Sequence, residues 1–236
     1  MFKALKRDRA FYGYLLRLTG PIALQNLITF SLGLIDTLMV SQLGNNEMAA
    51  VTAANVPVFL LISIVFGVQS GVGILISQYW GKKDIQAIRR VTALSLRMAG
   101  AVGLVVTVLL LAFPRQAMEI FTNEEPVIAA GAEYLRIVCL SYLFYGLTAT
   151  FLMVLRSTET VRVSVVIYAV SFAVNVGGNY VFIFGKLGAP RMGVAGAAVG
   201  TVLARLAEFV LVLGYMAFFE KKLHFRPRMV ALPSDG

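Results

Sequence analysis

Six stretches of mainly apolar residues, each long enough to cross a membrane, constrain this chain more than any other feature of its sequence. A helix needs about 20 such residues to cross the hydrocarbon core of a bilayer, and every stretch reaches that length. Charged residues make up 14% of the chain, whereas soluble domains have about 25%. We therefore expect an all-α membrane protein with six transmembrane helices. The spans are expected near residues 15–42, 50–79, 91–113, 127–154, 162–184 and 192–219.

The distribution of lysine and arginine predicts which side of the membrane each loop occupies. Sixteen of the 21 basic residues lie in the N-terminal segment, the second and fourth loops and the tail, whereas the other loops hold three. Because cytoplasmic loops carry the excess of basic residues, we expect a multi-pass protein of the cell inner (plasma) membrane with both termini in the cytoplasm. The chain divides into a cytoplasmic N-terminal segment (1–14), a six-helix transmembrane lobe (15–219) and a cytoplasmic linker (220–236).

The scarcity of reactive side chains argues against other classes of protein. The net charge is +9, but the basic residues sit between apolar stretches, so we predict no nucleic-acid partner. Cys139 lies in an apolar stretch and His224 in the tail, and they are the only cysteine and histidine. They make neither a metal site nor a nucleophile–base pair. With no paired carboxylates at membrane depth, we expect no enzyme and no cofactor.

Asp36 is the clearest ionisable residue deep inside a predicted span. About 10 Å of helix, at 1.5 Å per residue, separates it from the outer end of the first span near Leu43. Away from water, an ionised carboxylate needs a cation, hydrogen-bond donors or a proton, because a low dielectric disfavours the charged form. Asp36 is therefore predicted to carry H⁺ or Na⁺, and no metal other than Na⁺ is expected. The alternative is a structural carboxylate satisfied by hydrogen bonds.

Three polar residues in the fifth and sixth spans reach a similar depth. Asn175 and Asn179 share one helix face and lie about 15 Å and 9 Å from the outer end of the fifth span. Thr201 lies about ten residues inside the sixth span, which brings it to the same level. With Asp36, these residues predict a cation-binding site that couples transport to an ion. The alternative is that the amides only join helices through hydrogen bonds.

Four further side chains are possible cavity-lining residues. Pro21 removes a backbone hydrogen bond from the first span, and Gln25 and Asn26 follow it within two turns. Tyr142 and Tyr145 lie deep in the fourth span, where their rings could attract organic cations. The alternatives are ordinary packing of the tyrosines and the ordinary tolerance of proline in membrane helices.

Two pairs of opposite charges lie within predicted spans. Arg205 and Glu208 are three residues apart in the sixth span and are therefore neighbours on one helix face. Glu133 and Arg136 have the same spacing in the fourth span. Both spacings predict mutually neutralising structural pairs.

Two GxxxG motifs predict places where helix backbones approach each other closely. Glycine has no side chain, so a neighbouring membrane helix can pack directly against its backbone. The motifs are Gly67 to Gly71 in the second span and Gly196 to Gly200 in the sixth.

Five short motifs follow one another in the order found in a known transporter family. They are GLIDTLMVSQLG at Gly33–Gly44, GVGILISQYWGKKD at Gly71–Asp84, LRS at Leu155–Ser157, NVGGNYVFIFG at Asn175–Gly185 and GVAGAAVGT at Gly193–Thr201. Each motif is weak alone, but five in the right order at a consistent topology are specific. On these motifs the chain resembles the N-terminal half of the multidrug and toxic compound extrusion (MATE) family of secondary transporters.

The resemblance implies a fold and a function that the apolar stretches do not. A MATE-type transporter has twelve helices in two six-helix lobes, related by an axis along the membrane normal. This chain would form one lobe of an antiporter for multidrug efflux, which exports organic cations or other xenobiotics against H⁺ or Na⁺. The implied partners are the lipid bilayer, a small-molecule substrate held between the lobes and the second lobe.

The resemblance also assigns roles to individual residues. The first-span aspartate that binds the coupling ion in the family corresponds to Asp36, and the fifth-span polar pair corresponds to Asn175 and Asn179. Thr201 corresponds to a sixth-span ligand. Some branches of the family have a second carboxylate at the position of Asn179, so its absence here leaves both H⁺ and Na⁺ open as the coupling ion.

Length is the main departure from the family pattern, because the sequence stops where the second lobe would begin. We expect a truncated sequence rather than a working half-transporter. Two alternatives stay open: a flippase for a lipid-linked substrate, and a non-transporting membrane subunit or truncated remnant. A flippase would be favoured by a strongly cationic cavity, but Arg136 and Arg205 are the only basic residues deep within the spans.

Overall fold

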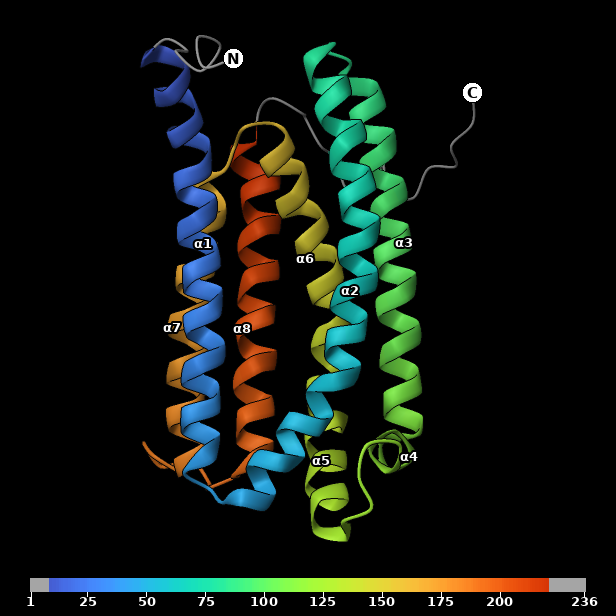
Figure 1. Cartoon of the computed structure of the whole chain (residues 1–236), viewed down its shortest axis with the longest axis vertical. Helices are drawn as coiled ribbons and strands as arrows, with labels where there is room; N and C mark the ends of the chain where they lie inside the picture. Colours follow the sequence, from blue (N-terminus) through green and yellow to red (C-terminus); the bar gives the residue numbers. More distant parts are fainter. Residues whose placement is uncertain (1–8, 221–236) are drawn as a thin grey trace, which may run out of the picture.

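The computed structural model describes residues 9–220, which form a bundle of long helices (Figure 1). Six helices in this part of the chain are long and apolar enough to cross a membrane, which confirms the predicted all-α membrane class. Most of the predicted N-terminal segment and linker, and His224, lie outside the described residues. The elements are α1 (Arg9–Ser41), α2 (Asn45–Gly81), α3 (Ile85–Ala112), α4 (Pro114–Glu119), α5 (Glu125–Val138), α6 (Leu140–Ser157), α7 (Arg162–Phe184), α8 (Val194–Gly214) and the π-helix η2 (Tyr215–Phe219).

Three helices begin before the apolar stretches that predicted them. α1 starts at Arg9, α2 at Asn45 and α3 at Ile85, each at least one turn early. Hydropathy marks only the part of a helix that suits hydrocarbon, whereas backbone hydrogen bonding continues into polar sequence. At α3, the Asp84 side chain caps the helix by accepting a hydrogen bond from the backbone N–H of Ala87 at 3.0 Å.

The fourth predicted span, residues 127–154, consists of two helices that meet at Cys139. α5 ends at Val138 and α6 begins at Leu140. The carbonyl of Cys139 accepts a hydrogen bond from the Thr107 hydroxyl of α3 at 2.9 Å, so this carbonyl is satisfied within the apolar core. The thiol of Cys139 is buried and forms no disulfide.

α7 and α8 approach each other closely, because glycines on α8 leave room for the backbone of α7. A Cβ added at Gly196 would lie 2.5 Å from the carbonyl group of Phe182, and one at Gly200 would collide with the Asn179 side chain. This GxxxG motif therefore marks a tight contact, as predicted. The prediction is wrong for the other motif: Gly67 and Gly71 lie on an exposed face of α2, and an added Cβ would meet no atom within 4 Å.

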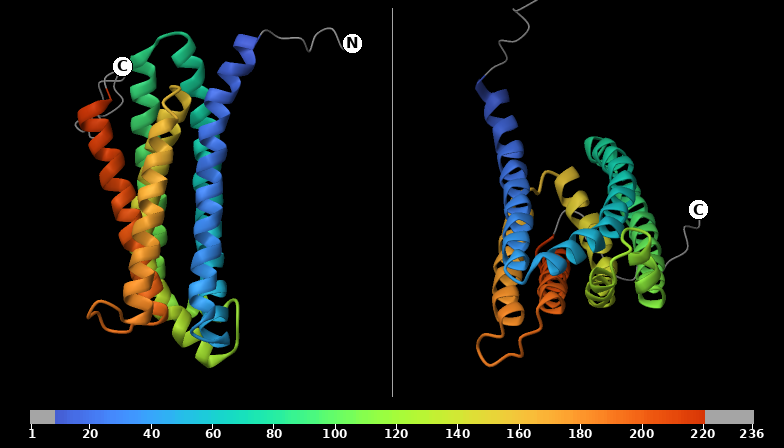
Figure 2. Two further views of the ribbon diagram at one scale, coloured as in Figure 1. Left: turned by 90° about the vertical axis from the view of Figure 1, so that its left-hand side faces the viewer. Right: turned by 60° about the horizontal axis from the view of Figure 1, so that its bottom comes forward.

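α1 lies along the edge of the bundle and packs mainly against α7 (Figures 1 and 2). In its apolar window 11% of the residues are buried, against 28% in that of α7. Near the start of α1, the Tyr14 hydroxyl donates a hydrogen bond to Glu159 in the α6–α7 turn at 2.7 Å. Farther along, Gln25 accepts one from Arg156 at 3.4 Å. Polar contacts thus supplement a small apolar contact area.

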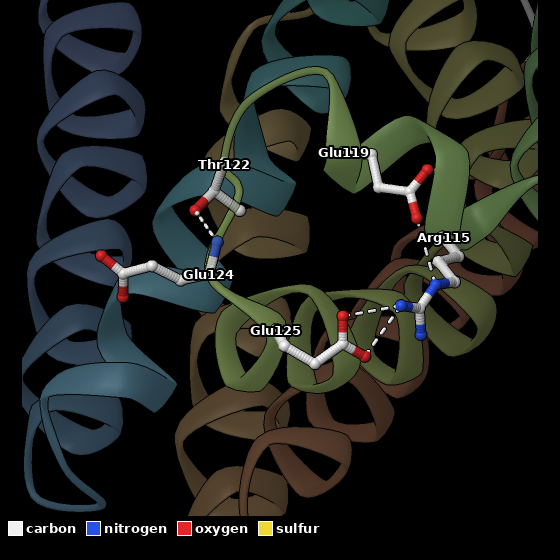
Figure 3. A network of polar contacts seen from close by, with 5 residues as sticks. All are labelled: Arg115, Glu119, Thr122, Glu124 and Glu125. Carbon is white, nitrogen blue, oxygen red and sulfur yellow. Dashed lines mark hydrogen bonds and ion pairs between the residues drawn. The ribbon is translucent and has the colours of Figure 1, made fainter.

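The short helix α4 joins α3 to α5 at the end of the bundle opposite the start of α1 (Figure 1). Its Arg115 contacts both carboxylate oxygens of Glu125 on α5, at 2.7 and 2.8 Å, and Glu119 at 3.1 Å. Glu125 and then Glu119 raise the pKa of the Arg115 guanidinium. Figure 3 shows Glu124 pointing away from this group. The three charged side chains are exposed, so they link α4 to α5 but add little stability.

Candidate functional site

Asp36 on α1 and two asparagines on α7 form a chain of hydrogen bonds. The side-chain nitrogen of Asn179 donates to Asp36 Oδ1 at 2.5 Å and to Asn175 Oδ1 at 3.1 Å. Asn175 and Asn179 are 1% and 0% exposed, because their spacing places both on the face of α7 that packs inside the bundle. The structure therefore joins three residues that were expected to lie at similar depth in the membrane.

The amide of Asn179 is fixed between two neighbouring helices. Its nitrogen faces Asp36 on α1, and its Oδ1 faces Gly200 on α8. Oδ1 has no hydrogen-bond partner in the described part of the chain, although buried acceptors are almost always paired. A cation, or a donor such as water, would satisfy this oxygen on the α8 side of the amide.

Asp36 opens onto a cavity of about 260 Å³ bounded by α1, α2, α5, α6 and α8. Thr201, Tyr142 and Tyr145 line the same cavity, as their predicted roles require. Pockets for small-molecule ligands usually measure about 300–1,000 Å³. A cavity of this size can hold an ion with its waters, or one part of a drug-sized molecule.

Thr201 lines the cavity together with Tyr134 of α5. Its hydroxyl donates to the carbonyl of Ala197 at 3.1 Å. Tyr134 is 5% exposed, and its hydroxyl lies within the electrostatic reach of Asp36. Thr201 and Asp36 therefore face one cavity without a direct hydrogen bond between them.

Arg205 on α8 adds a positive charge to the cavity wall. Its Nη1 lies 3.0 and 3.2 Å from the two carboxylate oxygens of Glu208, which is the predicted pair. Ser171 on α7 donates to Glu208 at 2.6 Å, and the guanidinium lies 4.9 Å from the centre of the Tyr145 ring. The Glu208 side chain is 2% exposed and that of Arg205 22%. The carboxylate is thus buried, while the guanidinium reaches the cavity and attracts Asp36.

The second pair that spacing predicted does not form. Glu133 and Arg136 are both exposed on α5, and no ion pair joins them. Exposed charges gain little from pairing, whereas leaving a buried carboxylate such as Glu208 without a partner is costly. Burial therefore decides which of two equally spaced pairs forms.

The two amides that follow Pro21 lie away from the cavity. Gln25 shares a helix face with Asp36, but 11 residues, or about 16 Å of helix, separate them. Gln25 is 6% exposed and bonded to Arg156, and Asn26 is exposed on another face of α1. The structure therefore places Gln25 in a contact between α1 and α6, and not in the cavity.

Several polar residues that line the cavity stand outside the sequence-based predictions. Three of them are Tyr134, Ser141 and Asn55. Helical periodicity could have indicated the first two, because residues 134, 141 and 145 lie on one face at intervals of seven and four. Asn55 is a polar residue inside the second predicted span, a signal of the same kind as Asn175.

The Asp36 carboxylate shares the cavity wall with hydroxyl side chains such as Thr37 and Thr201, and the Asn179 amide presents its nitrogen to that carboxylate. Oxygen ligands of this kind suit hard cations, and a carboxylate away from water also takes up a proton readily. Among residues 9–220, no group of three or more histidine, cysteine, aspartate and glutamate side chains could hold a metal ion. The chemistry that this arrangement supports is reversible binding of one small cation.

Six helices long enough to cross a membrane, with a partly buried carboxylate beside a cavity, agree with a membrane transport protein. The sequence model of the family described as MatE matches residues 21–181. The chain belongs to this family, multidrug and toxic compound extrusion (MATE), in agreement with the resemblance of its motifs.

Similar proteins place the chain within the family pattern. The probable multidrug resistance protein YoeA of Bacillus subtilis is 29% identical over 206 residues, which cover 87% of this chain and 44% of that protein. The probable multidrug resistance protein NorM of Rhizobium meliloti is 31% identical over 202 residues, which cover 83% and 42%. A structure described as the outward-facing conformation of a multidrug resistance MATE family transporter of the MOP superfamily aligns with a TM-score of 0.81 at 21% identity, covering 93% and 48%. The chain thus spans about half the length of the curated relatives it matches, and it corresponds to the N-terminal half.

Proposed function

We propose that this chain is the N-terminal lobe of a secondary active efflux transporter of the plasma membrane. It would antiport organic cations or other drugs against H⁺ or Na⁺, with both termini in the cytoplasm. The observation that carries the proposal is the hydrogen bond from Asn179 to Asp36, 2.5 Å long, at the edge of a polar cavity. The names of the relatives support the drug-efflux part of the proposal.

Asp36 acts as the coupling carboxylate in this mechanism. When it is charged and empty, the Asn179 nitrogen and the charge of Arg205 stabilise it. When it takes up H⁺ or Na⁺, its negative charge is neutralised and these contacts weaken. The two charge states then favour different positions of α1 relative to α7, and coupling requires that the exported compound bind the two positions unequally.

The substrate site is completed by the second lobe. The cavity of about 260 Å³ is smaller than the usual range for drug-sized ligands, so this lobe supplies one wall of a larger site. Tyr145 contributes aromatic surface to that wall, Tyr142 lies behind it at 2% exposure, and Asp36 contributes negative charge. A substrate with a cationic end and an aromatic body fits these groups.

The test is gradient-driven transport in proteoliposomes that contain the transporter to which this chain belongs. Export of a fluorescent organic cation is measured with an imposed H⁺ or Na⁺ gradient, for the parent and for Asp36→Asn. An ion-coupled effect of 1–3 kcal/mol corresponds to about 5- to 150-fold, so we expect a loss of transport within that range. The amide keeps the size of the side chain but cannot change its charge.

Asp84→Asn is the matched control, because Asp84 is an exposed carboxylate at the N-cap of α3 and asparagine also caps helices. We expect this variant to transport like the parent. Unchanged export by Asp36→Asn, with unchanged ion dependence, would refute the coupling role. A flippase for lipid-linked substrates is less well supported, because the cavity wall carries Asp36 as well as Arg205 and is not strongly cationic.

A further inference from the structure

A second pocket lies at the opposite end of the lobe from the Asp36 cavity, beside the N-terminal end of α7. It measures about 580 Å³, and α1, the α6–α7 turn, the start of α7 and η2 surround it. Figure 2 (left view) shows α1 and the end of α8 diverging on either side of α7 at this level. The ends of transmembrane helices lie near the lipid headgroups, so this pocket opens at that depth.

Two arginines from different helices converge on this pocket. Arg17 lies on α1 and Arg162 begins α7, and both line the pocket. Neither makes a hydrogen bond or an ion pair with another residue between 9 and 220. Guanidinium groups bind phosphate oxygens through paired N–H donors, and the uncapped N-terminus of α7 adds a favourable dipole for an anion.

Two carboxylates lie on the wall of the same pocket. Glu159 accepts the hydrogen bond from Tyr14 through its Oε1, and Glu220 is 9% exposed. The formal charges of the two arginines and two glutamates cancel. A ligand that fits this wall carries a negative and a positive group close together, and the positive group must be able to donate hydrogen bonds to carboxylates.

An open apolar groove lies along α7 and begins within one turn of Arg162. Valine and alanine side chains alone line it, and its volume is about 580 Å³. Its residues follow Arg162 at intervals of three, four, seven, eight, eleven and twelve, so the arginine and the groove share one face of α7. They are Val165, Val166, Ala169, Val170, Ala173 and Val174. A hydrocarbon chain fits such a groove, and a soluble polar ligand does not.

We propose that the pocket and groove together bind one phospholipid with a phosphoethanolamine headgroup. Its phosphate lies between Arg17 and Arg162, and its primary ammonium lies beside Glu159 and Glu220. One acyl chain follows the groove on α7. The lipid would then fill the space between α1 and the end of α8, and tie the edge helix to the rest of the lobe.

The experiment measures lipid binding to the purified transporter by native mass spectrometry. Phosphatidylethanolamine, phosphatidylglycerol and phosphatidylcholine with identical acyl chains are titrated separately. We expect the ethanolamine lipid to bind most tightly, because choline has no N–H donor and glycerol has no positive charge. Replacing both arginines (Arg17→Gln, Arg162→Gln) should weaken its binding by about tenfold to a hundredfold, since hydrogen bonds to charged groups are lost.

The matched control removes two charges from the same end of the bundle but outside the pocket. Lys82→Gln with Lys83→Gln changes the turn between α2 and α3 and should bind the lipid like the parent. Equal binding by the two double variants would overturn the proposal. So would a parent that binds the three lipids equally. Thermal unfolding of each variant checks that its fold is kept, and Arg17→Lys with Arg162→Lys should retain part of the affinity because the charges remain.

A competition measurement distinguishes binding of a lipid from binding of a soluble phosphate compound. Free phosphoethanolamine should displace the lipid only at a far higher concentration, because it cannot use the groove. Ala169→Phe fills the groove and should weaken lipid binding without changing the binding of free phosphoethanolamine. If free phosphoethanolamine competes as well as the lipid, or if Ala169→Phe binds the lipid normally, the acyl chain does not occupy the groove and the proposal fails.

Discussion

The α7–α8 pair and α1 are held in the lobe in different ways, although both contribute to the Asp36 site. α7 and α8 meet backbone to backbone at Gly196 and Gly200, and the buried Glu208 also joins them through Ser171. α1 lies at the edge with little of its apolar surface buried. Its deepest polar contact with α7 is the hydrogen bond between Asp36 and Asn179.

This difference indicates which element moves most easily. Close-packed interfaces resist displacement, whereas elements with few buried contacts open at a low free energy. The carboxylate lies on the loosely held helix and its amide partners on the firmly packed one. A change of charge at Asp36 therefore acts on the element that is easiest to displace. Pro21 makes α1 easier to bend, because it removes one backbone hydrogen bond from the helix.

Arg205→Leu should cause the largest loss of stability, and the loss should arise in the firmly packed α7–α8 pair. It leaves the buried Glu208 with Ser171 as its only remaining partner among residues 9–220. Breaking a buried pair from one side costs about 3–5 kcal/mol, and we expect the lower end of that range because the Arg205 side chain is partly exposed. Denaturant unfolding of the purified transporter measures the loss. Arg136→Leu, at an exposed and unpaired arginine, is the control, and equal losses in the two variants would contradict the prediction.

Gly196→Ala should weaken the contact between α7 and α8 and lower the free energy of unfolding, but by less than Arg205→Leu does. The new methyl group would meet the Phe182 backbone at 2.5 Å, and overpacking of this kind costs about 1–3 kcal/mol. Gly177→Ala is the control on α7, since an added Cβ there meets no atom within 4 Å. The same unfolding measurement compares the two. If Gly196→Ala is as stable as Gly177→Ala, the close contact between the helices does not contribute to stability.

Tyr14→Phe should loosen α1 and leave the rest of the lobe unchanged. It removes the hydrogen bond to Glu159 at the exposed start of the helix, so we expect no measurable change in unfolding. Tyr180→Phe is the control, because that hydroxyl makes no hydrogen bond with the described residues.

Distances between pairs of spin labels can report this loosening. One pair joins Leu16 on α1 to Val166 on α7, and a reference pair joins Val166 to Leu211 on α8; all three side chains are exposed. Tyr14→Phe should broaden the first distance distribution and leave the second unchanged. Broadening of both distributions, or of neither, would contradict the view that α1 moves separately from the α7–α8 pair.

Much of the fold could be predicted from the sequence, because crossing a membrane depends on length and hydropathy alone. The break at Cys139 could not, since the Cys139 carbonyl accepts a hydrogen bond from the Thr107 hydroxyl of another helix, a tertiary contact that hydropathy does not show. The two GxxxG motifs look alike in sequence, but one packs tightly and the other faces outward. Which face of a helix meets a neighbour is settled by tertiary packing and not by the motif.

The central residues of the candidate site could be predicted from their depth in the membrane and their spacing along the helices. Asp36, Asn175 and Asn179 were expected at one level, and the structure joins them by hydrogen bonds; their ion-binding role stays a prediction. Gln25 shares a face with Asp36 yet lies outside the cavity, because the cavity ends before its level is reached. Arg205 was expected mainly as a partner of Glu208, and its place on the cavity wall depends on how α8 is rotated.

The length of α2 has a consequence for handling this protein. Its 37 residues extend about 55 Å, whereas the hydrocarbon core is about 30 Å thick. The bend in the first part of α2, which contains Pro57, and tilting absorb part of the excess. The remainder carries the turn at Lys82–Asp84 into water at the end of the bundle away from α4 and α5 (Figure 1). An antibody fragment raised against that turn would bind the hairpin of α2 and α3. It would add mass for imaging, and it would not cover the Asp36 cavity.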